Sequence, residues 1–161
     1  MSELNFKIRK AEDADVAGLT RLIGDCFAEY EGCVLDLEGI DKPMLAIASY
    51  VDSYDGEFWV VLSEDSLVGS VGYIIEDGKM ELIKLYVDKT HRRQGLASRL
   101  LSLVLDAAAK NNIELDLWSD TRFVEAHAFY SHHGFEKQDE TRFLHDPSNS
   151  WEFHFTQNSR K

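Results

Sequence analysis

One stretch of this sequence limits the possible folds more than any other: a predicted strand at residues 80–87 leads through a short polar loop into a predicted helix at residues 94–110. The first turn of that helix contains Gly95, and Arg92 and Arg93 stand just before it. Free N–H groups and the positive end of the helix dipole attract anions at such a helix start. The loop has neither the G-x-G-x-x-G spacing of dinucleotide-binding folds nor the G-x-x-x-x-G-K-[ST] spacing of P-loops. The sequence therefore predicts a pyrophosphate site of another kind.

The hydrophobic periodicity around this stretch predicts a mixed α/β sheet. Alternating apolar residues predict strands, and apolar residues three and four positions apart predict helices. Asp77-Gly78 is a strong hairpin signal. The predicted strands cover residues 6–9, 58–62, 67–75, 80–87 and 113–118, with later strand segments at 135–137, 142–144 and 151–155, and the predicted helices cover 16–27, 44–50, 94–110 and 123–132. Antiparallel hairpins come early in this order and crossover helices come later.

The composition indicates one soluble domain that covers residues 1–161. A chain of this length buries a core without disulfides or metal ions. No apolar run is long enough to span a membrane and the N-terminus lacks a signal pattern, so we expect a cytoplasmic protein with no membrane partner. The formal net charge of −12 at pH 7 argues against nucleic acid as a partner, because phosphate binding needs clustered Lys and Arg.

The negative charge lies mainly in the first half of the chain. Residues 1–90 carry 8 Lys+Arg and 19 Asp+Glu, a net of −11, whereas residues 91–161 carry 9 and 10, a net of −1. Either an ordinary solvated surface or a front that attracts cations explains this difference. The two cysteines, Cys26 and Cys33, have the spacing of neither a redox motif nor a zinc site, and the six histidines are scattered, so we expect no metal site.

Two short segments have the spacing of known motifs. Residues 92–97, Arg-Arg-Gln-Gly-Leu-Ala, resemble the [RQ]-x-x-G-x-[GA] signature of the GNAT superfamily of N-acetyltransferases. Residues 126–135, Ala-His-Ala-Phe-Tyr-Ser-His-His-Gly-Phe, are similar to the A-x-x-[LF]-Y-x-x-x-G-F segment near the end of many of these enzymes. The resemblance implies a mostly antiparallel sheet of six to seven strands, flanked by about four helices and splayed at the cofactor slot.

The resemblance also implies acetyl-coenzyme A as the co-substrate. Its pantetheine would lie along the strand that ends at Val87, and its pyrophosphate would rest on N–H groups of residues 92–97. The strand at 113–118 would splay away to open a slot for the acetyl thioester. The cofactor-binding residues expected from the resemblance are Leu85, Tyr86, Val87, Arg92, Arg93, Gln94, Gly95, Leu96, Ala97 and Ser98.

Acetyl transfer to an amine needs a base for the amine and an acid for the departing thiolate. Tyr130 matches the family's tyrosine that acts as general acid, although a packing role for an aromatic residue is the alternative. Glu81 matches a glutamate that several members use as general base, and a carboxyl inside an apolar strand needs a partner or a purpose. Asp120 is a possible substitute for it. The chain departs from the family at Phe123, where many members carry an asparagine that contacts the cofactor.

The acceptor is expected over residues 28–60, a region that varies with substrate in the family. Carboxylates beside aromatic rings suit a small cationic amine, and Tyr30, Glu31, Trp59 and Asp120 are the candidate substrate-binding residues. Arg142, His145 and Trp151 could border the site if the last strands fold over it. A peptide or protein acceptor and a non-catalytic acetyl-coenzyme A sensor are the alternatives, and the resemblance implies a homodimer.

Overall fold

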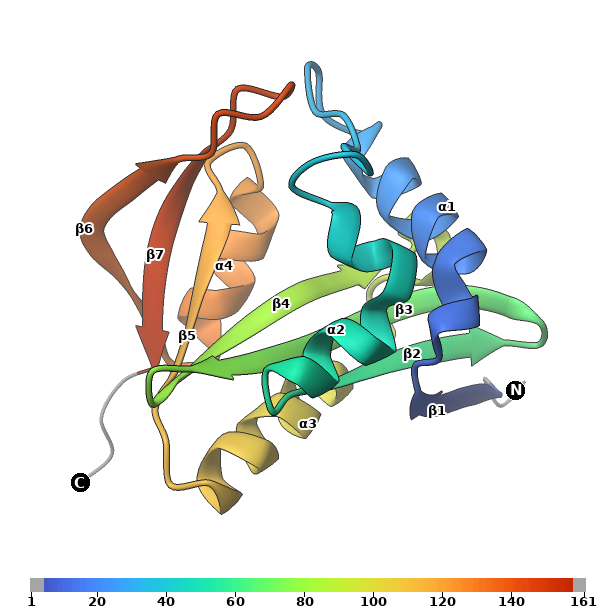
Figure 1. Ribbon diagram of the computed structural model, residues 1–161, viewed down its shortest axis with the longest axis horizontal. Coiled ribbons are helices and arrows are strands. Elements are labelled where there is room, and N and C mark those ends of the chain that lie inside the picture. Colours follow the sequence, from blue (N-terminus) through green and yellow to red (C-terminus); the bar gives the residue numbers. More distant parts are fainter. Residues whose placement is uncertain (1–4, 158–161) are drawn as a thin grey trace.

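The computed structural model describes residues 5–157, which form one seven-stranded sheet (Figure 1). The strand order is β1-β2-β3-β4-β5-β7-β6, and each neighbouring pair is antiparallel except β4 and β5. The strands are β1 (Phe6–Lys10), β2 (Glu57–Ser63), β3 (Ser66–Glu76), β4 (Lys79–Val87), β5 (Leu115–Asp120), β6 (Phe135–Phe143) and β7 (Trp151–Gln157). This is the mixed, mostly antiparallel sheet that the sequence predicts.

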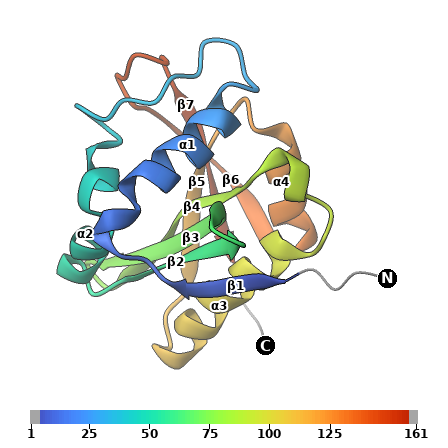
Figure 2. The same cartoon turned by 90° about the vertical axis from the view of Figure 1, so that its right-hand side faces the viewer.

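Within residues 5–157, four α-helices cover the two faces of the sheet. They are α1 (Val16–Phe27), α2 (Ile47–Ser53), α3 (Leu96–Lys110) and α4 (Val124–His132). Figure 2 shows α1 and α2 on one side of β2–β4 and α3 on the other. Each face buries its own apolar cluster: Leu19, Leu22 and Phe58 belong to the first, and Leu100 and Phe155 belong to the second. The buried stripe of α3 is the one that its apolar spacing predicts.

Strands β4 and β5 pair at only one end, and this opens the sheet. Their parallel register covers three positions, Met80↔Leu115, Glu81↔Asp116 and Leu82↔Leu117. Beyond them the two strands separate toward their carboxyl ends (Figure 1). A strand edge without a neighbour presents unpaired N–H and C=O groups. The second half of β4 therefore offers main-chain hydrogen-bonding groups to whatever occupies the gap.

The sequence placed some element boundaries differently from the structure. The predicted segments 135–137 and 142–144 are one strand, β6, whose register shifts between Lys137 and Thr141 and so hides the alternation. Helix α3 begins at Leu96 and not at residue 94, because Gly95 adopts the left-handed region with φ +80°. Gly95 is therefore the residue before the helix rather than a member of its first turn.

Candidate active site

A pocket of about 570 Å³ lies where β4 and β5 part. Glu81 and Tyr86 from β4, Trp118 and Asp120 from β5, and Tyr130 from α4 are among its lining residues. Two loops border it at the top of Figure 1, one after α1 and one before β7. They are joined through the Ser148 hydroxyl, which accepts from the Val34 N–H (2.7 Å) and donates to the Val34 carbonyl (3.0 Å).

A β-bulge in β4 shapes the wall of this pocket. Between the register pairs Gly72↔Ile83 and Ser70↔Tyr86, β4 has two residues and β3 has one. Lys84, one of the two, has a positive φ of 53°, and the Ser70 hydroxyl donates to its carbonyl (2.7 Å). Bulges re-aim side chains and bend strands. Here the bulge bends β4 close to the point where the strand loses its β5 neighbour.

The backbone of the loop before α3 suits a concavity of main-chain N–H groups that could bind an anion. Arg93 and Gly95 have positive φ values of 63° and 80°, and the helix starts at the next residue, Leu96. Left-handed residues that alternate with right-handed ones turn successive N–H groups to one side, and the helix dipole adds positive potential. A Cβ at Gly95 would meet no atom within 4 Å, so the backbone conformation and not crowding requires glycine there.

The expected cofactor-binding residues are distributed over two parts of the site. Leu85, Tyr86, Val87, Arg92 and Ala97 line the pocket, whereas Arg93, Gln94 and Gly95 are exposed on the loop. Leu96 is buried in the core, and the Ser98 hydroxyl lies 3.3 Å from His133 Nε2. The pocket and the concavity therefore share the short segment from Val87 to Ala97.

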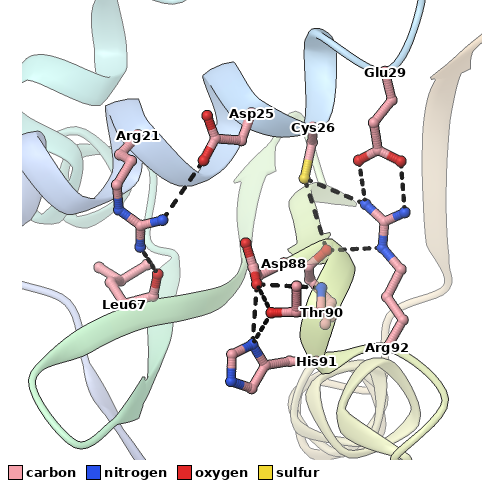
Figure 3. Close-up of polar contacts among 10 residues, drawn as sticks. Arg21, Asp25, Cys26, Glu29, Leu67, Asp88, Thr90, His91 and Arg92 are labelled. Atoms are coloured by element: carbon pink, nitrogen blue, oxygen red, sulfur yellow. Dashed lines mark hydrogen bonds and ion pairs between the residues drawn. The ribbon is translucent and has the colours of Figure 1, made fainter.

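The Arg92 side chain ties this segment to α1 (Figure 3). Its Nη1 and Nη2 atoms donate to the two carboxylate oxygens of Glu29 (2.8 and 2.7 Å), and its Nε donates to the Val87 carbonyl (3.0 Å). Cys26 Sγ lies 3.6 Å from Nη2. The positive charge of this guanidinium is paired with Glu29. Its place at the end of β4 fixes the loop relative to α1.

Replacing Arg92 with Gln should lower the free energy of unfolding by about 1 kcal/mol, since a bidentate but part-exposed ion pair is lost. The Arg92 hydrogen bonds lower the pKa of Glu29, so this stability is present at neutral pH and disappears as pH falls through that pKa. Urea unfolding at several pH values measures the effect. Arg93→Gln is the matched control, and an equal loss in both variants would show that the ion pair contributes nothing specific.

Tyr130 points from α4 into the pocket and is 6% exposed. Its ring packs against Phe135 and Phe155, with centroids 5.8 Å away in both cases. Its hydroxyl makes no hydrogen bond within residues 5–157. Burial raises the pKa of Tyr130, so the phenol carries its proton at neutral pH. A protonated phenol at the pocket wall can donate that proton to an atom in the pocket.

Glu81 lines the same pocket from the paired half of β4. Its Oε2 lies 3.9 Å from Arg142 Nη2, and Arg142 Nε donates to Glu152 Oε1 (2.7 Å). Burial raises the pKa of Glu81, and Arg142 opposes that shift. Burial also raises the pKa of Glu152. A carboxylate with a raised pKa is a stronger base than an ordinary one, which suits proton removal from an ammonium group.

Asp120 is held by Arg122, in contrast to Glu81. Its Oδ1 accepts from the backbone N–H (2.8 Å) and Nε (2.9 Å) of Arg122, and its Oδ2 accepts from Nη2 (2.8 Å). Burial would raise the pKa of Asp120, but the Arg122 hydrogen bonds outweigh it and the pKa is lowered. Asp120 is thus a weaker base than Glu81, with its lone pairs engaged at the end of β5.

The structure brings only part of the expected acceptor region to the pocket. Tyr30 lines it, and its ring lies 4.8 Å from that of Phe123, the residue that departs from the family pattern. Glu31 is exposed and does not line the pocket. Trp59 is on the other face of the sheet, because Phe58 and Val60 on either side of it face α1 and α2. It does not line the pocket, so it is not placed to contact an acceptor there.

Four charged residues at the pocket were not singled out from the sequence. They are Lys84, Glu125, Asp146 and Glu152. Lys84 Nζ lies 2.8 Å from Asp41 Oδ1, a pair that depends on the bulge and on a loop that has no periodic pattern. Glu152 could have been predicted, since it alternates with Trp151 and Phe153 in a late strand. Of the possible bordering residues, Arg142 lines the pocket, whereas His145 and Trp151 do not.

Comparison with known proteins places this geometry in a family. A family model described as an acetyltransferase (GNAT) domain matches residues 54–137, just over half of the chain. The chain belongs to the GNAT acetyltransferase family. The matched range contains β2 to β5, the loop before α3, and α4 with Tyr130.

Individual relatives agree with this assignment. Human N-acetyltransferase 8 is 34% identical over 102 residues, which are 59% of this chain and 45% of that protein, so the chain spans about half the length of this relative. A GNAT-family acetyltransferase from Staphylococcus aureus has the same fold, with a TM-score of 0.78 at 22% identity over 96% of this chain and 100% of that one. The PaiA N-acetyltransferase from Thermoplasma acidophilum, solved in complex with coenzyme A, has a TM-score of 0.70 at 18% identity over 93% and 98%.

The helices themselves give one further finding. The longest helix within residues 5–157 is α3, with 15 residues. No helix in that range is both long and apolar enough to cross a lipid bilayer.

Proposed function

We propose that this chain is an N-acetyltransferase that moves the acetyl group of acetyl-coenzyme A to a primary amine by direct transfer in a ternary complex. One observation carries the proposal: Glu81 and Tyr130 line a single pocket at the opening between β4 and β5, which continues to the concavity before α3. A base, an acid and an anion site then belong to one continuous surface. Family membership supports the same reaction.

The chain's groups fit coenzyme A along this surface. The free edge of β4 near Leu85 and Val87 can pair with the amides of pantetheine, as a neighbouring strand would. The N–H groups of residues 92–97 can bind the pyrophosphate, and Gly95 is the residue that permits their arrangement. The relative from Thermoplasma acidophilum was solved with coenzyme A, which supports this choice of co-substrate.

The proposed proton transfers use the two titratable groups at the opening. Glu81 takes a proton from the acceptor's ammonium group, directly or through water, and the free amine attacks the thioester carbonyl. Tyr130 donates its proton to the sulfur as the C–S bond breaks, and the proton that the product nitrogen loses restores the phenol. The acetyl group ends on nitrogen and the coenzyme leaves as a thiol.

The two cysteines at the pocket favour this direct route over an acetyl-enzyme. Cys26 and Cys33 both line the pocket, and a thiolate there could in principle carry the acetyl group. Burial raises the pKa of each thiol to about 11. Both are therefore mainly protonated at neutral pH and are weak nucleophiles.

The charge of the pocket favours a small cationic acceptor. Six carboxylates line it, from Asp41, Glu81, Asp120, Glu125, Asp146 and Glu152, against three cations, from Lys84, Arg92 and Arg142. Aromatic rings at Tyr30, Tyr50 and Trp118 complete the wall. Carboxylates and aromatic faces attract ammonium groups. Tyr30 and Asp120 remain our candidate substrate contacts, and Trp59 and Glu31 do not.

Thiol release from acetyl-coenzyme A, measured across polyamines, amino acids, aminoglycosides and short basic peptides, tests the proposal. We expect turnover with a small cationic amine. Preference for the peptides would favour a peptide or protein acceptor. Tight acetyl-coenzyme A binding with no turnover in the whole panel would contradict catalysis and favour a sensor.

The quaternary state and location are part of the same proposal. We propose a homodimer, because members of the family often pair through their late strands and β6 lies at an edge of the sheet. A sedimentation mass equal to one chain would contradict it. A cytoplasmic location stays a prediction, in keeping with two free cysteines that are both buried.

A further inference from the structure

Arg142 occupies an unusual place beside the proposed base. It lies on β6, two strands away from β5 in the sheet order, yet its guanidinium reaches across to the pocket. Its Nε donates to Glu152 on β7 (2.7 Å), and its Nη2 lies 3.9 Å from Glu81 on β4. The contact with Glu81 is an ion pair without a hydrogen bond. The Glu81 carboxylate thus keeps its lone pairs for another group.

Stacked rings hold this guanidinium in position. Its Cζ lies 4.4 Å from the centroid of the Trp118 ring. Trp118 in turn stacks on His154, with centroids 4.3 Å apart and planes 15° apart. His154 is clamped between two carboxylates, Asp116 (2.8 Å) and Glu140. Side chains from β5, β6 and β7 therefore build one layered support that ends under Arg142, which restricts the rotamers of a normally flexible side chain.

The charges around Glu81 explain why the position of Arg142 matters. The titratable groups that face Glu81 are Glu76 on β3, Asp116 on β5, Glu152 on β7, Tyr50 on α2 and Arg142 on β6. Burial and the three carboxylates all disfavour a negative charge on Glu81, and Arg142 is the cation that opposes them. Without that cation, the carboxyl would be protonated over a wider pH range and could not accept a proton from the acceptor.

We propose that Arg142 is a positioning residue for the base: held by Glu152 and Trp118, it keeps the Glu81 carboxylate ionised and turned toward the acceptor while leaving its oxygens free. The inference rests on the proposed function, and it adds a residue outside both family motifs. Because Arg142 acts through Glu81, its effect must depend on pH in a way that a packing role would not.

The test compares pH profiles of kcat/KM for the wild type and four variants, one of them Glu81→Gln, with acetyl-coenzyme A and the best amine of the panel. Arg142→Gln should lower kcat/KM roughly tenfold near pH 6, since one opposing charge is lost, and about twofold or less near pH 9. Arg142→Lys keeps the charge and should lie close to the wild type at low pH. Lys137→Gln is the matched control: it removes a cation from the same strand, but one that lies over Phe153, away from the pocket.

The outcomes separate this inference from the proposed function. An acidic limb that moves to higher pH in Arg142→Gln, and not in Lys137→Gln, supports the inference. A uniform loss at all pH values, or an equal shift in both variants, overturns it. If Arg142→Gln folds poorly, Arg142→Lys decides the question. A loss of kcat/KM in Arg142→Lys that is equal at all pH values, despite the retained charge, also overturns the inference. If Glu81→Gln leaves the acidic limb unchanged, the assignment of Glu81 as base fails and the inference fails with it.

Discussion

Tyr130→Phe should lower kcat by roughly 10²-fold or more, the size expected for the loss of a general acid. Tyr130 lines the pocket, and burial raises the pKa of Tyr130, so the phenol keeps its proton at every ordinary assay pH. Affinity for coenzyme A should hardly change, because the hydroxyl acts only when the thiolate departs. Steady-state kinetics, together with calorimetric titration of coenzyme A, measures the two quantities.

Stability separates a catalytic Tyr130 from a packing one. The ring contacts with Phe135 and Phe155 remain in Tyr130→Phe, and the hydroxyl has no hydrogen bond to lose within the described residues. The free energy of unfolding should therefore stay the same or rise slightly. Tyr54→Phe, which removes a hydroxyl outside the pocket, is the control and should retain full kcat. Unchanged turnover in Tyr130→Phe would reduce this residue to a packing role.

Glu81→Gln should cost about 10²-fold in kcat/KM near pH 6, and the cost should shrink as pH rises. Burial raises the pKa of Glu81, so the carboxylate, the basic form, is lost as pH falls through that raised pKa. The wild type should therefore show an acidic limb at that pKa, whereas the Gln variant should instead rise with pH as the free amine forms. At high pH the acceptor deprotonates in solution, and a base is less necessary. The pH dependence of kcat/KM is the measurement.

The same Glu-to-Gln substitution outside the pocket is the control for Glu81→Gln. Glu64→Gln alters an exposed carboxyl in the turn between β2 and β3 and should keep the wild-type profile. A Glu81→Gln profile parallel to that of the wild type would transfer the role to Asp120 or to water. Asp120 is the less suitable of these, since Arg122 occupies both of its oxygens.

The fold was predictable wherever a local pattern is strong. Asp77-Gly78 forms the turn between β3 and β4, and the apolar stripe of α3 is buried as its spacing predicts. The hydrophobic patterns mispredicted element boundaries where the backbone is irregular. The register shift in β6 hid one long strand as two short segments, and the φ of +80° at Gly95 shortened the start of α3.

The site was predictable only as far as its motifs reach. Tyr130 and residues 92–97 each lie within a short contiguous motif, and the motifs predicted their place at the site. The pairing of Arg92 with Glu29 joins residues 63 positions apart, and no local sequence pattern predicts it. Trp59 is the opposite case, a residue that was predicted to contact the substrate but does not line the pocket. Strand alternation places it with Val61 on the α3 face.

Glu152 and Arg142 show why a site at a sheet opening is hard to read from sequence. They come from β7 and β6, and Arg142 joins Glu152 to Glu81 of β4 across β5, which lies between β4 and β7 in the sheet order. The strand order decides which charges face one another. This order cannot be predicted from the hydrophobic pattern of each strand. The charge balance around the base is therefore a property of topology.

The most direct test of the central claim follows a labelled acetyl group. Enzyme in excess over acetyl-coenzyme A labelled in the acetyl carbonyl is mixed with the preferred amine, quenched at short times, and analysed by mass spectrometry of both protein and small molecules. The account predicts that label appears on the amine nitrogen as fast as free thiol appears, with none on the protein. Label on Cys26 or Cys33 before it reaches the amine, or label released as acetate while the amine stays unmodified, would contradict direct acetyl transfer in this pocket.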